Sequence, residues 1–279
     1  MPPQSVYHKG LQLGGSMAIL ERRDKNAVAY LRLNAPERLN ALSDEMISAL
    51  QTTFNSFYSD KSVRAVVLEG AGKAFCAGHD LKQMTEARNQ ADGGAAVFKG
   101  LFDRCATFMQ TIQKIPQPVI AQVHGIATAA GCQLVSTCDL AIATEETKFG
   151  VNGVNIGLFC STPMVALSRN IHRKRAFEML VTGEFMTAQE AKVAGLINKV
   201  VAEDSLSSAT SFLAEVISSK LGSAVKTGKT AFYRQIQLPV NEAYAYTGDV
   251  MVENMLNNET EEGIAAFIDK RDPNWSQEP

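Results

Sequence analysis

Two glycine-bearing turns hold the residues whose types and spacing are best suited to chemistry. The first covers residues 73–82 (KAFCAGHDLK) and the second covers residues 125–133 (GIATAAGCQ). Small residues let a ligand approach the backbone closely, and a helix N-terminus presents unpaired N–H groups with a partial positive charge. If the two turns converge, their N–H groups suit an oxyanion such as the one that forms on a thioester oxygen. The residue types alone also fit turns with a purely structural role.

Strand-like segments stand before both turns. Residues 63–69 (VRAVVLE) run into the first turn, and residues 119–123 (VIAQV) run into the second. Further strands are predicted over residues 27–33, 139–143 and 196–201. Because helical patterns separate these strands, we expect an α/β protein built from ββα or βαβ units rather than a sandwich.

Apolar residues at helical spacing mark the helices of the first half. Ser43 is suited to the N-cap of a helix whose apolar stripe runs from Met46 to Phe57. A second helix is predicted over residues 97–112 and ends before Pro116. A short helix is predicted around residues 131–137, directly after the second turn.

The second half of the chain is predicted to be mainly helical. Thr187 and Glu190 fit a capping box, and Gly195 stands where that helix would end. Three further helical patterns are predicted between Ser205 and Lys270.

Five motifs resemble, in order and spacing, those of the enoyl-CoA hydratase/isomerase (crotonase) superfamily. They are residues 40–42 (NAL), 74–82 (AFCAGHDLK), 125–140 (with AGC and CDL), 188–196 (AQEAKVAGL) and 262–275 (from EG to the closing W). The match runs from about residue 18 to the end of the chain. Residues 157–163 and 229–233 resemble one particular branch of that family.

The resemblance implies a crotonase-like spiral of ββα units with a helical C-terminal trimerisation region. On this basis residues 1–16 are interpreted as a leader or tag-like segment, 17–200 as the spiral core, and 201–279 as the helical region for oligomerisation. The implied assembly is a homotrimer or a dimer of trimers. The implied ligand is an acyl-CoA thioester, whose CoA moiety is part of the substrate, and no separate cofactor is expected.

By motif position, the resemblance places the two backbone N–H donors of an oxyanion hole at His79 and Ala130. The family usually has glycine at the second position. Alanine still supplies an N–H group, so the hole should survive if the backbone there is not left-handed.

The resemblance also implies contacts to the CoA moiety. These are expected at Arg38, Ala41, Ala77 and Lys82. Lys82 resembles the lysine that lies on the adenine side of CoA in the family. Arg38 stands where a basic residue meets the CoA phosphates, although a solvated surface charge explains this arginine equally well.

The main departure from the family concerns the two glutamates that act as acid and base in hydration. By motif position they fall on Gln133 and Gly153. An amide cannot accept a proton near neutral pH, and glycine has no side chain. Because loss of a general base commonly lowers a rate ~10²–10⁴-fold, efficient hydration is not expected. Isomerases of the family place a carboxylate at the second position or slightly later, where this chain has Cys160 and Ser161.

Four side chains are candidates for a substitute chemistry. The His79 ring could act as an acid or base, since histidine titrates near physiological pH; alternatively, only its backbone N–H group matters. Cys160 could be a nucleophile if a base or cation lay nearby, and Ser161 a hydroxyl donor; alternatively, both only line the site. Asp80 fits a carboxylate that stabilises the turn better than it fits a base.

Two classes of function therefore remain. The retained turns favour an enzyme that acts on an acyl-CoA through an enolate-like intermediate, by residual hydration, decarboxylation or hydrolysis. Gln133 and Gly153 favour a protein that binds acyl-CoA without turnover. Decarboxylation stays open because some family members that lack both glutamates decarboxylate malonyl-type thioesters, and residues 77–80 (AGHD) resemble them.

Composition argues against several other classes. The 279 residues are 46% hydrophobic, enough for a sizeable core, and no apolar run approaches the ~20 residues that span a bilayer. A net charge of −2 without basic blocks argues against nucleic acid as a partner. The 5 cysteines form no CxxC pair and the 4 histidines are scattered, so we expect reduced thiols and no metal. The resemblance implies the mitochondrial matrix for a eukaryotic source and the cytoplasm for a bacterial one.

Overall fold

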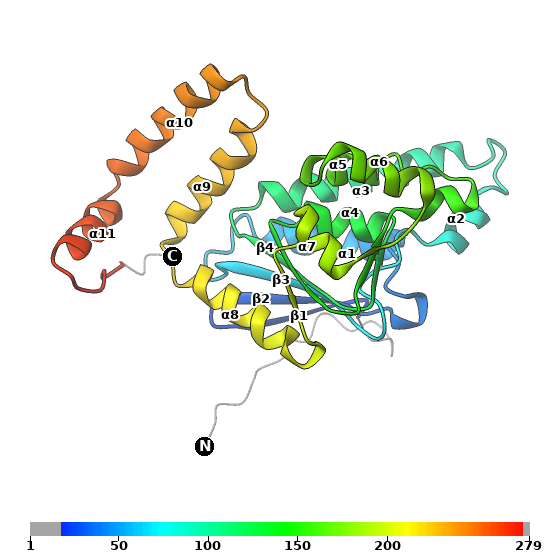
Figure 1. The fold of residues 1–279 in the computed structure, drawn as a ribbon, viewed down its shortest axis with the longest axis horizontal. Helices are drawn as coiled ribbons and strands as arrows, with labels where there is room; N and C mark the ends of the chain where they lie inside the picture. Colours follow the sequence, from blue (N-terminus) through cyan, green and yellow to red (C-terminus); the bar gives the residue numbers. More distant parts are fainter. Residues whose placement is uncertain (1–17, 276–279) are drawn as a thin grey trace.

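A six-stranded sheet forms the centre of the computed structural model, which describes residues 18–275 (Figure 1). The leader-like segment 1–16 and Met17 lie outside the described residues. The strands, in spatial order, are β1 (Leu20–Lys25), β2 (Val28–Leu33), β3 (Ala65–Gly70), β4 (Val119–Val123), β6 (Leu140–Thr144) and β9 (Lys199–Val201). β1 pairs with β2 antiparallel, and every other pair in this sheet is parallel. The α/β class expected from the sequence is thus confirmed.

A smaller sheet carries the second turn. Its strands are β5 (Ile126–Thr128), β7 (Lys148–Gly150) and β8 (Met186–Thr187), with β7 in the middle. β5 follows β4 after only two residues and leads directly towards α4 (Ala130–Thr137). The short link between the two sheets therefore fixes where α4 begins.

Helices cover both faces of the large sheet. One face is covered by α1 (Asp44–Ser56), α3 (Ala95–Lys114) and α4, and α8 (Leu206–Ser218) packs on the other, across β2, β3, β4 and β6. The remaining helices of the body are α2 (Leu81–Ala87), α5 (Pro163–Asn170), α6 (Arg173–Thr182) and α7 (Ala188–Ala194). Short 3-10 turns lie at η1 (Pro36–Arg38), η2 (Asn152–Ile156) and η3 (Glu203–Ser205).

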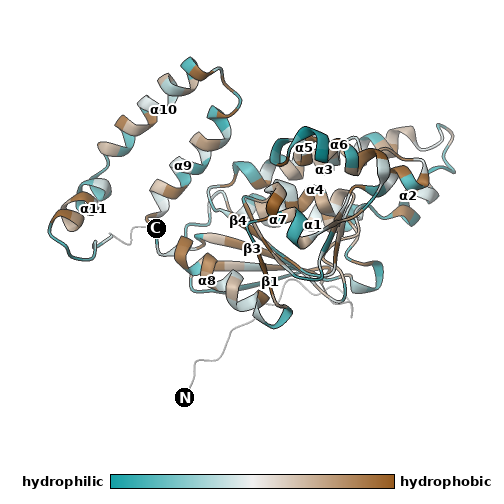
Figure 2. Ribbon diagram, viewed as in Figure 1, coloured by the Kyte–Doolittle hydropathy of each residue, from teal (hydrophilic) through white to brown (hydrophobic). Residues whose placement is uncertain are grey.

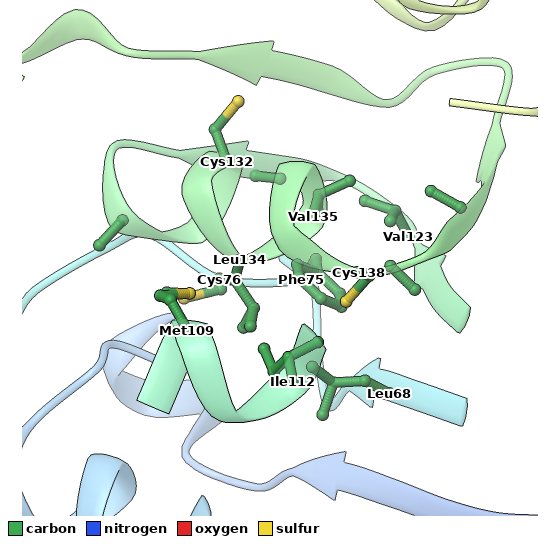
Figure 3. Close-up of a cluster of buried hydrophobic side chains, with 14 of the residues drawn as sticks. Leu68, Phe75, Cys76, Met109, Ile112, Val123, Cys132, Leu134, Val135 and Cys138 are labelled. Carbon is green, nitrogen blue, oxygen red and sulfur yellow. The ribbon is translucent and has the colours of Figure 1, made fainter. Parts of the chain in front are cut away.

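The main core lies between the large sheet and the α1–α3–α4 layer. Figure 3 shows Leu134 of α4 above Ile112 of α3, with Leu68 of β3 nearby. On α1, Ser43 accepts a hydrogen bond from the Met46 N–H, and Met46 is fully buried. The N-cap and the apolar stripe predicted for this helix are both confirmed.

Three details differ from the sequence predictions. β1 was not predicted, because it is a largely exposed edge strand of sequence LERRDK without an apolar pattern. The strand predicted over 196–201 is shorter, since Leu196 and Ile197 pack into the core after the turn at Gly195. Four helices, not three, follow Ser205: α8, α9 (Gly222–Gln235), α10 (Val240–Met255) and α11 (Asn258–Ile268). The break before Gly222 separates α8 from α9.

Helices α9–α11 form an arm that extends from the body (Figure 1). Figure 2 shows hydrophobic residues spread along the arm. Its large apolar side chains are mostly exposed, including Phe232, Tyr244, Met251, Leu256 and Phe267. An exposed apolar surface of this extent is typical of a protein contact.

A buried ion pair joins the arm to the body. The Nζ atom of Lys229 donates to Asp139 Oδ2 at 2.7 Å and to the carbonyl oxygens of Ile112 and Gln117, both at 2.8 Å. The Tyr233 hydroxyl donates to the other carboxylate oxygen of Asp139 at 2.7 Å. Burial lowers the pKa of Lys229, and the carboxylate beside it opposes that shift. Every N–H of the ammonium group has an acceptor, so the pair can be stable out of water.

Replacement of Lys229 by methionine is expected to lower the free energy of unfolding by ~3–5 kcal/mol, because it leaves the Asp139 charge buried without its partner. Urea unfolding would measure the loss. The exposed Lys226 lies on the same helix, and Lys226→Met should change stability by less than ~0.5 kcal/mol. Equal losses in the two variants would contradict a specific role for the buried pair.

Candidate functional site

The two glycine-bearing turns touch each other. Gly78 has a φ of 92°, and a Cβ atom there would lie 2.9 Å from the Ala129 Cβ and 3.1 Å from the Ala130 nitrogen. A side chain at position 78 would therefore push the turns apart, and its positive φ also disfavours any residue other than glycine. This contact brings His79 and Ala130, which are 51 positions apart in the sequence, into the same site.

Backbone hydrogen bonds hold the first turn between its neighbours. On one side, the Cys76 N–H donates to Ile126 O at 3.2 Å, and the Thr128 N–H donates to Cys76 O at 3.0 Å. On the other side, the Leu42 N–H donates to Gly78 O at 2.7 Å. The first turn is thus a bridge between β5 and the segment that precedes α1.

His79 and Ala130 each carry an unused backbone N–H group. No hydrogen bond within residues 18–275 uses either group as a donor. Ala130 is the first residue of α4, and its φ is not positive. The positive φ falls instead on Ala129, at 49° with a ψ of −120°, which is a costly conformation for alanine. The condition set from the sequence, that the backbone at Ala130 is not left-handed, is met.

Asn40 anchors the loop beside the site, a role that sequence reasoning did not assign. Its Oδ1 accepts from the Ala35 N–H at 3.0 Å, and its Nδ2 donates to the carbonyls of Ala71 and Ala74, both at 2.8 Å. The side chain is fully buried, and the residue has a positive φ of 54°. Asparagine tolerates this conformation better than most residues. In the sequence, the sign of this role was the place of Asn40 in the NAL motif at residues 40–42.

Gln133 lies one helical turn after Ala130 on α4. Its side chain is 5% exposed and makes no hydrogen bond within the described part of the chain; the Oε1 atom is fully buried. Gln51 and Gln117 also have a buried Oε1 without a partner, but the Nε2 atom of each is held by hydrogen bonds. Among these three glutamines, Gln133 differs because neither its Oε1 nor its Nε2 atom has a hydrogen-bond partner among the described residues.

Position 153, where the resemblance places the second glutamate, has no room for a side chain. A Cβ atom on Gly153 would collide with the Leu158 carbonyl oxygen and would lie 2.9 Å from the Cys160 sulfur. The loop after η2 therefore fills the space that a side chain at 153 would need. A carboxylate could be placed at position 133, but not at 153 unless this loop moved.

Neither Cys160 nor Ser161 has the neighbours that an activated nucleophile needs. Burial raises the pKa of the Cys160 thiol, and the hydrogen bond from the Gly153 N–H only partly offsets this effect. The Ser161 hydroxyl donates to Phe159 O at 3.4 Å, and the side chain is exposed. A buried thiol with a raised pKa stays protonated at neutral pH, which disfavours thiolate chemistry.

The His79 ring is held in one orientation. Its Nδ1 lies 3.4 Å from the Leu42 carbonyl oxygen, and its edge packs against Phe102 with ring centroids 5.6 Å apart. Because a carbonyl oxygen only accepts, Nδ1 carries the proton of the neutral ring and Nε2 keeps the lone pair. Nε2 is buried and has no hydrogen-bond partner among the described residues. Burial also lowers the pKa of His79, so the ring is neutral at pH 7.

The lowered pKa predicts a pH-dependent loss of stability. As the pH falls below ~6.5, the unfolded chain binds a proton at this histidine, while the folded chain does not until the lower folded pKa is reached. Across that interval, His79 should reduce the free energy of unfolding by at most ~1.4 kcal/mol per pH unit. His79→Gln should remove this contribution in urea unfolding between pH 5 and 7.5. The His172→Gln variant, changed at an exposed histidine, should retain it. If the free energy of unfolding depended on pH equally steeply in the wild type and in both variants, the interpretation would be contradicted.

The residues expected to meet CoA gather near the start of α2. Asp80 is the N-cap of this helix and accepts from the N–H groups of Lys82 and Gln83, at 3.0 and 3.2 Å. The Arg38 guanidinium lies 3.5 Å from the same carboxylate, and Lys82 is exposed. Asp80 is therefore the turn-stabilising carboxylate that the sequence indicated. Arg38 also lies 3.5 Å from the Glu37 carboxylate, so its charge is balanced by two carboxylates, whereas no ion pair is described for the exposed Lys82.

Ala41 and Ala77, the other two residues expected to meet CoA, form backbone hydrogen bonds around the first turn. The Ala77 N–H donates to Leu39 O at 3.0 Å, and the Ala41 N–H donates to Arg38 O at 3.1 Å.

Among residues 18–275, no group of three or more His, Cys, Asp or Glu is arranged to hold a metal ion. In the same residues, no helix is both long enough and apolar enough to span a membrane.

The free amide of Gln133 predicts an unusual response to substitution. Because a buried polar group without partners costs ~1–3 kcal/mol, Gln133→Met should leave the free energy of unfolding unchanged or raise it by about 1–2 kcal/mol. Gln117→Met is the matched control, since Gln117 is equally buried but donates to three carbonyl oxygens. That variant should lose ~2–4 kcal/mol in urea unfolding. Similar losses in both variants would mean that the Gln133 amide supports the fold.

The chain is similar to known proteins over nearly its whole length. Residues 23–278 match the family described as enoyl-CoA hydratase/isomerase. The protein named enoyl-CoA hydratase domain-containing protein 3, mitochondrial, from Xenopus laevis is 42% identical over 254 residues, which cover 91% of this chain and 85% of that protein. The Homo sapiens protein of the same name is 42% identical over 257 residues, covering 92% and 83%.

Solved structures of similar proteins confirm the crotonase-like fold that the resemblance implies. A structure described as an enoyl-CoA hydratase from Mycobacterium smegmatis has a TM-score of 0.88 and 52% identity, and the match covers 92% of this chain and 98% of that one. The human enoyl Coenzyme A hydratase domain-containing protein 3 has a TM-score of 0.88 and 39% identity, covering 92% and 100%. The similarity therefore includes both turns and the elements that position them.

Proposed function

The chain belongs to the enoyl-CoA hydratase/isomerase family, and we propose that it binds an acyl-CoA thioester through the backbone N–H groups of His79 and Ala130. The contact of Gly78 with Ala129 and Ala130 is the observation that carries this proposal, because it brings the two unused donors into one site. Such donors stabilise the negative charge that develops on a thioester oxygen, and each is typically worth ~3 kcal/mol. The substrate supplies the CoA moiety, and the proposal requires no further cofactor.

The rest of the site supports binding and polarisation better than it supports hydration. Gln133 is neutral, and position 153 is closed to any side chain. The family's acid and base pair is therefore lost, and hydration is expected to be slowed by at least ~10²–10⁴-fold. Reactions in which the substrate supplies its own electrons, such as loss of CO₂ from a malonyl-type thioester, need no such base.

Three features support the rest of the proposal. Lys82, exposed at the start of α2, suits the adenine side of CoA, and Arg38, which pairs with Glu37 and Asp80, lies close enough to the first turn to reach the CoA phosphates. The exposed apolar side chains of α9–α11 support assembly through the arm as a trimer or a dimer of trimers. The vertebrate relatives are named mitochondrial, which supports the mitochondrial matrix for a eukaryotic source and leaves the cytoplasm for a bacterial one.

Incubation of the purified protein with crotonyl-, malonyl- and methylmalonyl-CoA, followed by mass spectrometry and calorimetry, tests the proposal. We expect micromolar binding, ~−8 kcal/mol, and hydration of crotonyl-CoA far below the rate of an intact acid and base pair. Product from a malonyl-type thioester would identify decarboxylation, free CoA would identify hydrolysis, and binding without product would identify a non-catalytic protein. Failure to bind any of the three thioesters would rule the proposal out.

Gly78→Ala tests the contact between the turns. The added Cβ would press on Ala129, so affinity for the thioester should fall at least ~tenfold, a loss of ~1.4 kcal/mol. Gly93→Ala is the matched control, since Gly93 also has a positive φ of 65° but a Cβ there would meet nothing within 4 Å. Unchanged affinity in Gly78→Ala, or an equal loss in Gly93→Ala, would mean that the contact does not form the binding site.

A further inference from the structure

One surface of the body is unusually apolar. In the body, residues 18–221, most of the exposed large apolar side chains lie between residues 156 and 185. Phe177 and Val181 of α6 are 61% and 45% exposed, and they line a groove of about 590 Å³ together with Arg173, Lys174 and Glu178. An exposed apolar surface of this kind, bordered by charged side chains, is typical of a protein contact.

The loop after η2 continues this surface. The Asn155 side chain donates to the Gly183 carbonyl oxygen at 3.2 Å, which ties η2 to the end of α6. Ile156 and Leu158, which follow Asn155, are 64% and 45% exposed. We call residues 156–159 and the exposed side of α6 the α6 face. The chain's own arm leaves this face uncovered, since it extends from another part of the body (Figure 1).

The α6 face is positively charged, although the whole chain has a net charge of −2. Residues 156–185 contain four Lys or Arg and only two Glu. Arg175 pairs with Glu178 and Glu190, whereas among residues 18–275 no ion pair involves Arg173 or Lys174. The groove therefore combines apolar side chains with two cations that can pair with an acidic partner.

The outer part of the arm has the opposite charge and a similar apolar surface. Residues 235–269, which include α10 and α11, contain seven Asp or Glu and no Lys or Arg. Val252 and Leu256 are 60% and 78% exposed and lie one helical turn apart. The exposed Asp249 and Glu253 each stand three residues before one of them, so the acidic row borders the apolar row. The arm thus complements the α6 face in both charge and polarity.

We propose that the acidic and apolar side of α10 in one copy of the chain docks on the α6 face of a second copy. This inference rests on the assembly through the arm that is part of the proposed function, and it adds the surface that receives the arm. Because the arm and the α6 face are different surfaces, the contact is heterologous, and a ring of three copies satisfies every arm and every face.

The docked arm would also reach the candidate site. Leu158 belongs to the α6 face, and its carbonyl oxygen fills the space beside Gly153. An arm on this face covers the outer side of that loop. Each copy therefore receives part of the wall around its site from the next copy in the ring.

Two variants of the intact chain test the contact. Phe177→Asp places a carboxylate opposite the acidic arm, and Val252→Lys places a cation opposite the basic α6 face. In analytical ultracentrifugation at micromolar concentration, each should shift the mass from that of the wild-type oligomer to the 30.2 kDa of the monomer. Phe212→Asp is the matched control, because Phe212 is 69% exposed on α8, across the large sheet, and this variant should stay oligomeric. Lys174→Glu replaces Phe177→Asp if the latter does not fold.

An equimolar mixture of the two variants distinguishes this contact from other modes of assembly. Phe177→Asp keeps an intact arm and Val252→Lys keeps an intact α6 face, so one contact per pair remains. The mixture should form a complex of about 60 kDa, twice the mass of the chain, and nothing larger. In hydrogen exchange, residues 156–159 should exchange more slowly in the wild type than in Phe177→Asp, whereas α8 should exchange equally in both.

The outcomes separate this inference from the assembly on which it rests. An oligomer that persists in Phe177→Asp but not in Val252→Lys would assign the arm to other arms and overturn docking on the α6 face, while assembly through the arm would stand. Absence of the mixed complex, or equal exchange of residues 156–159 in the two proteins, would also overturn the inference. A monomeric wild type would refute the assembly itself, and it would leave the thioester site to its own test.

Discussion

The close approach of Gly78 to Ala129 and Ala130 is the constraint on which the rest of the site depends. It requires a residue without a side chain at 78 and a costly backbone conformation at Ala129. The surrounding structure supports both requirements. β5 joins the small sheet to β4, and Asn40 ties its own loop to residues 71–74 at the start of the first turn. The two sheets and the buried Asn40 side chain therefore hold Gly78 against Ala129 and Ala130.

The packing around Gly153 bears directly on the proposed chemistry. The loop after η2 leaves no room for a side chain at this position. Its carbonyl oxygen at Leu158 occupies the space, and the neighbouring cysteine thiol is neutral at neutral pH. A carboxylate at position 153 would require this loop to move as well as a change of sequence.

Much of the fold could be predicted from the sequence, because buried strands and amphipathic helices have clear patterns. β3, β4, α1, α3 and the capping box of α7 were all found in this way. The edge strand β1 was missed since its side chains face solvent and need no apolar alternation. The motifs also predicted which residues belong to the site. They could not show that Gly153 is blocked by a backbone carbonyl, or that Gln133 lacks partners, because both facts depend on packing between segments distant in sequence.

The buried lysine of the arm has a consequence for the site that its role as an anchor does not suggest. Asp139 accepts a hydrogen bond from Lys229 of α9 and another, at 2.7 Å, from the N–H of Val119, where β4 begins. β4 leads through β5 to the second turn, so one carboxylate connects the arm with the strand that precedes this turn. Displacement of α9 would therefore remove a hydrogen-bond donor from the same carboxylate oxygen that holds the start of β4.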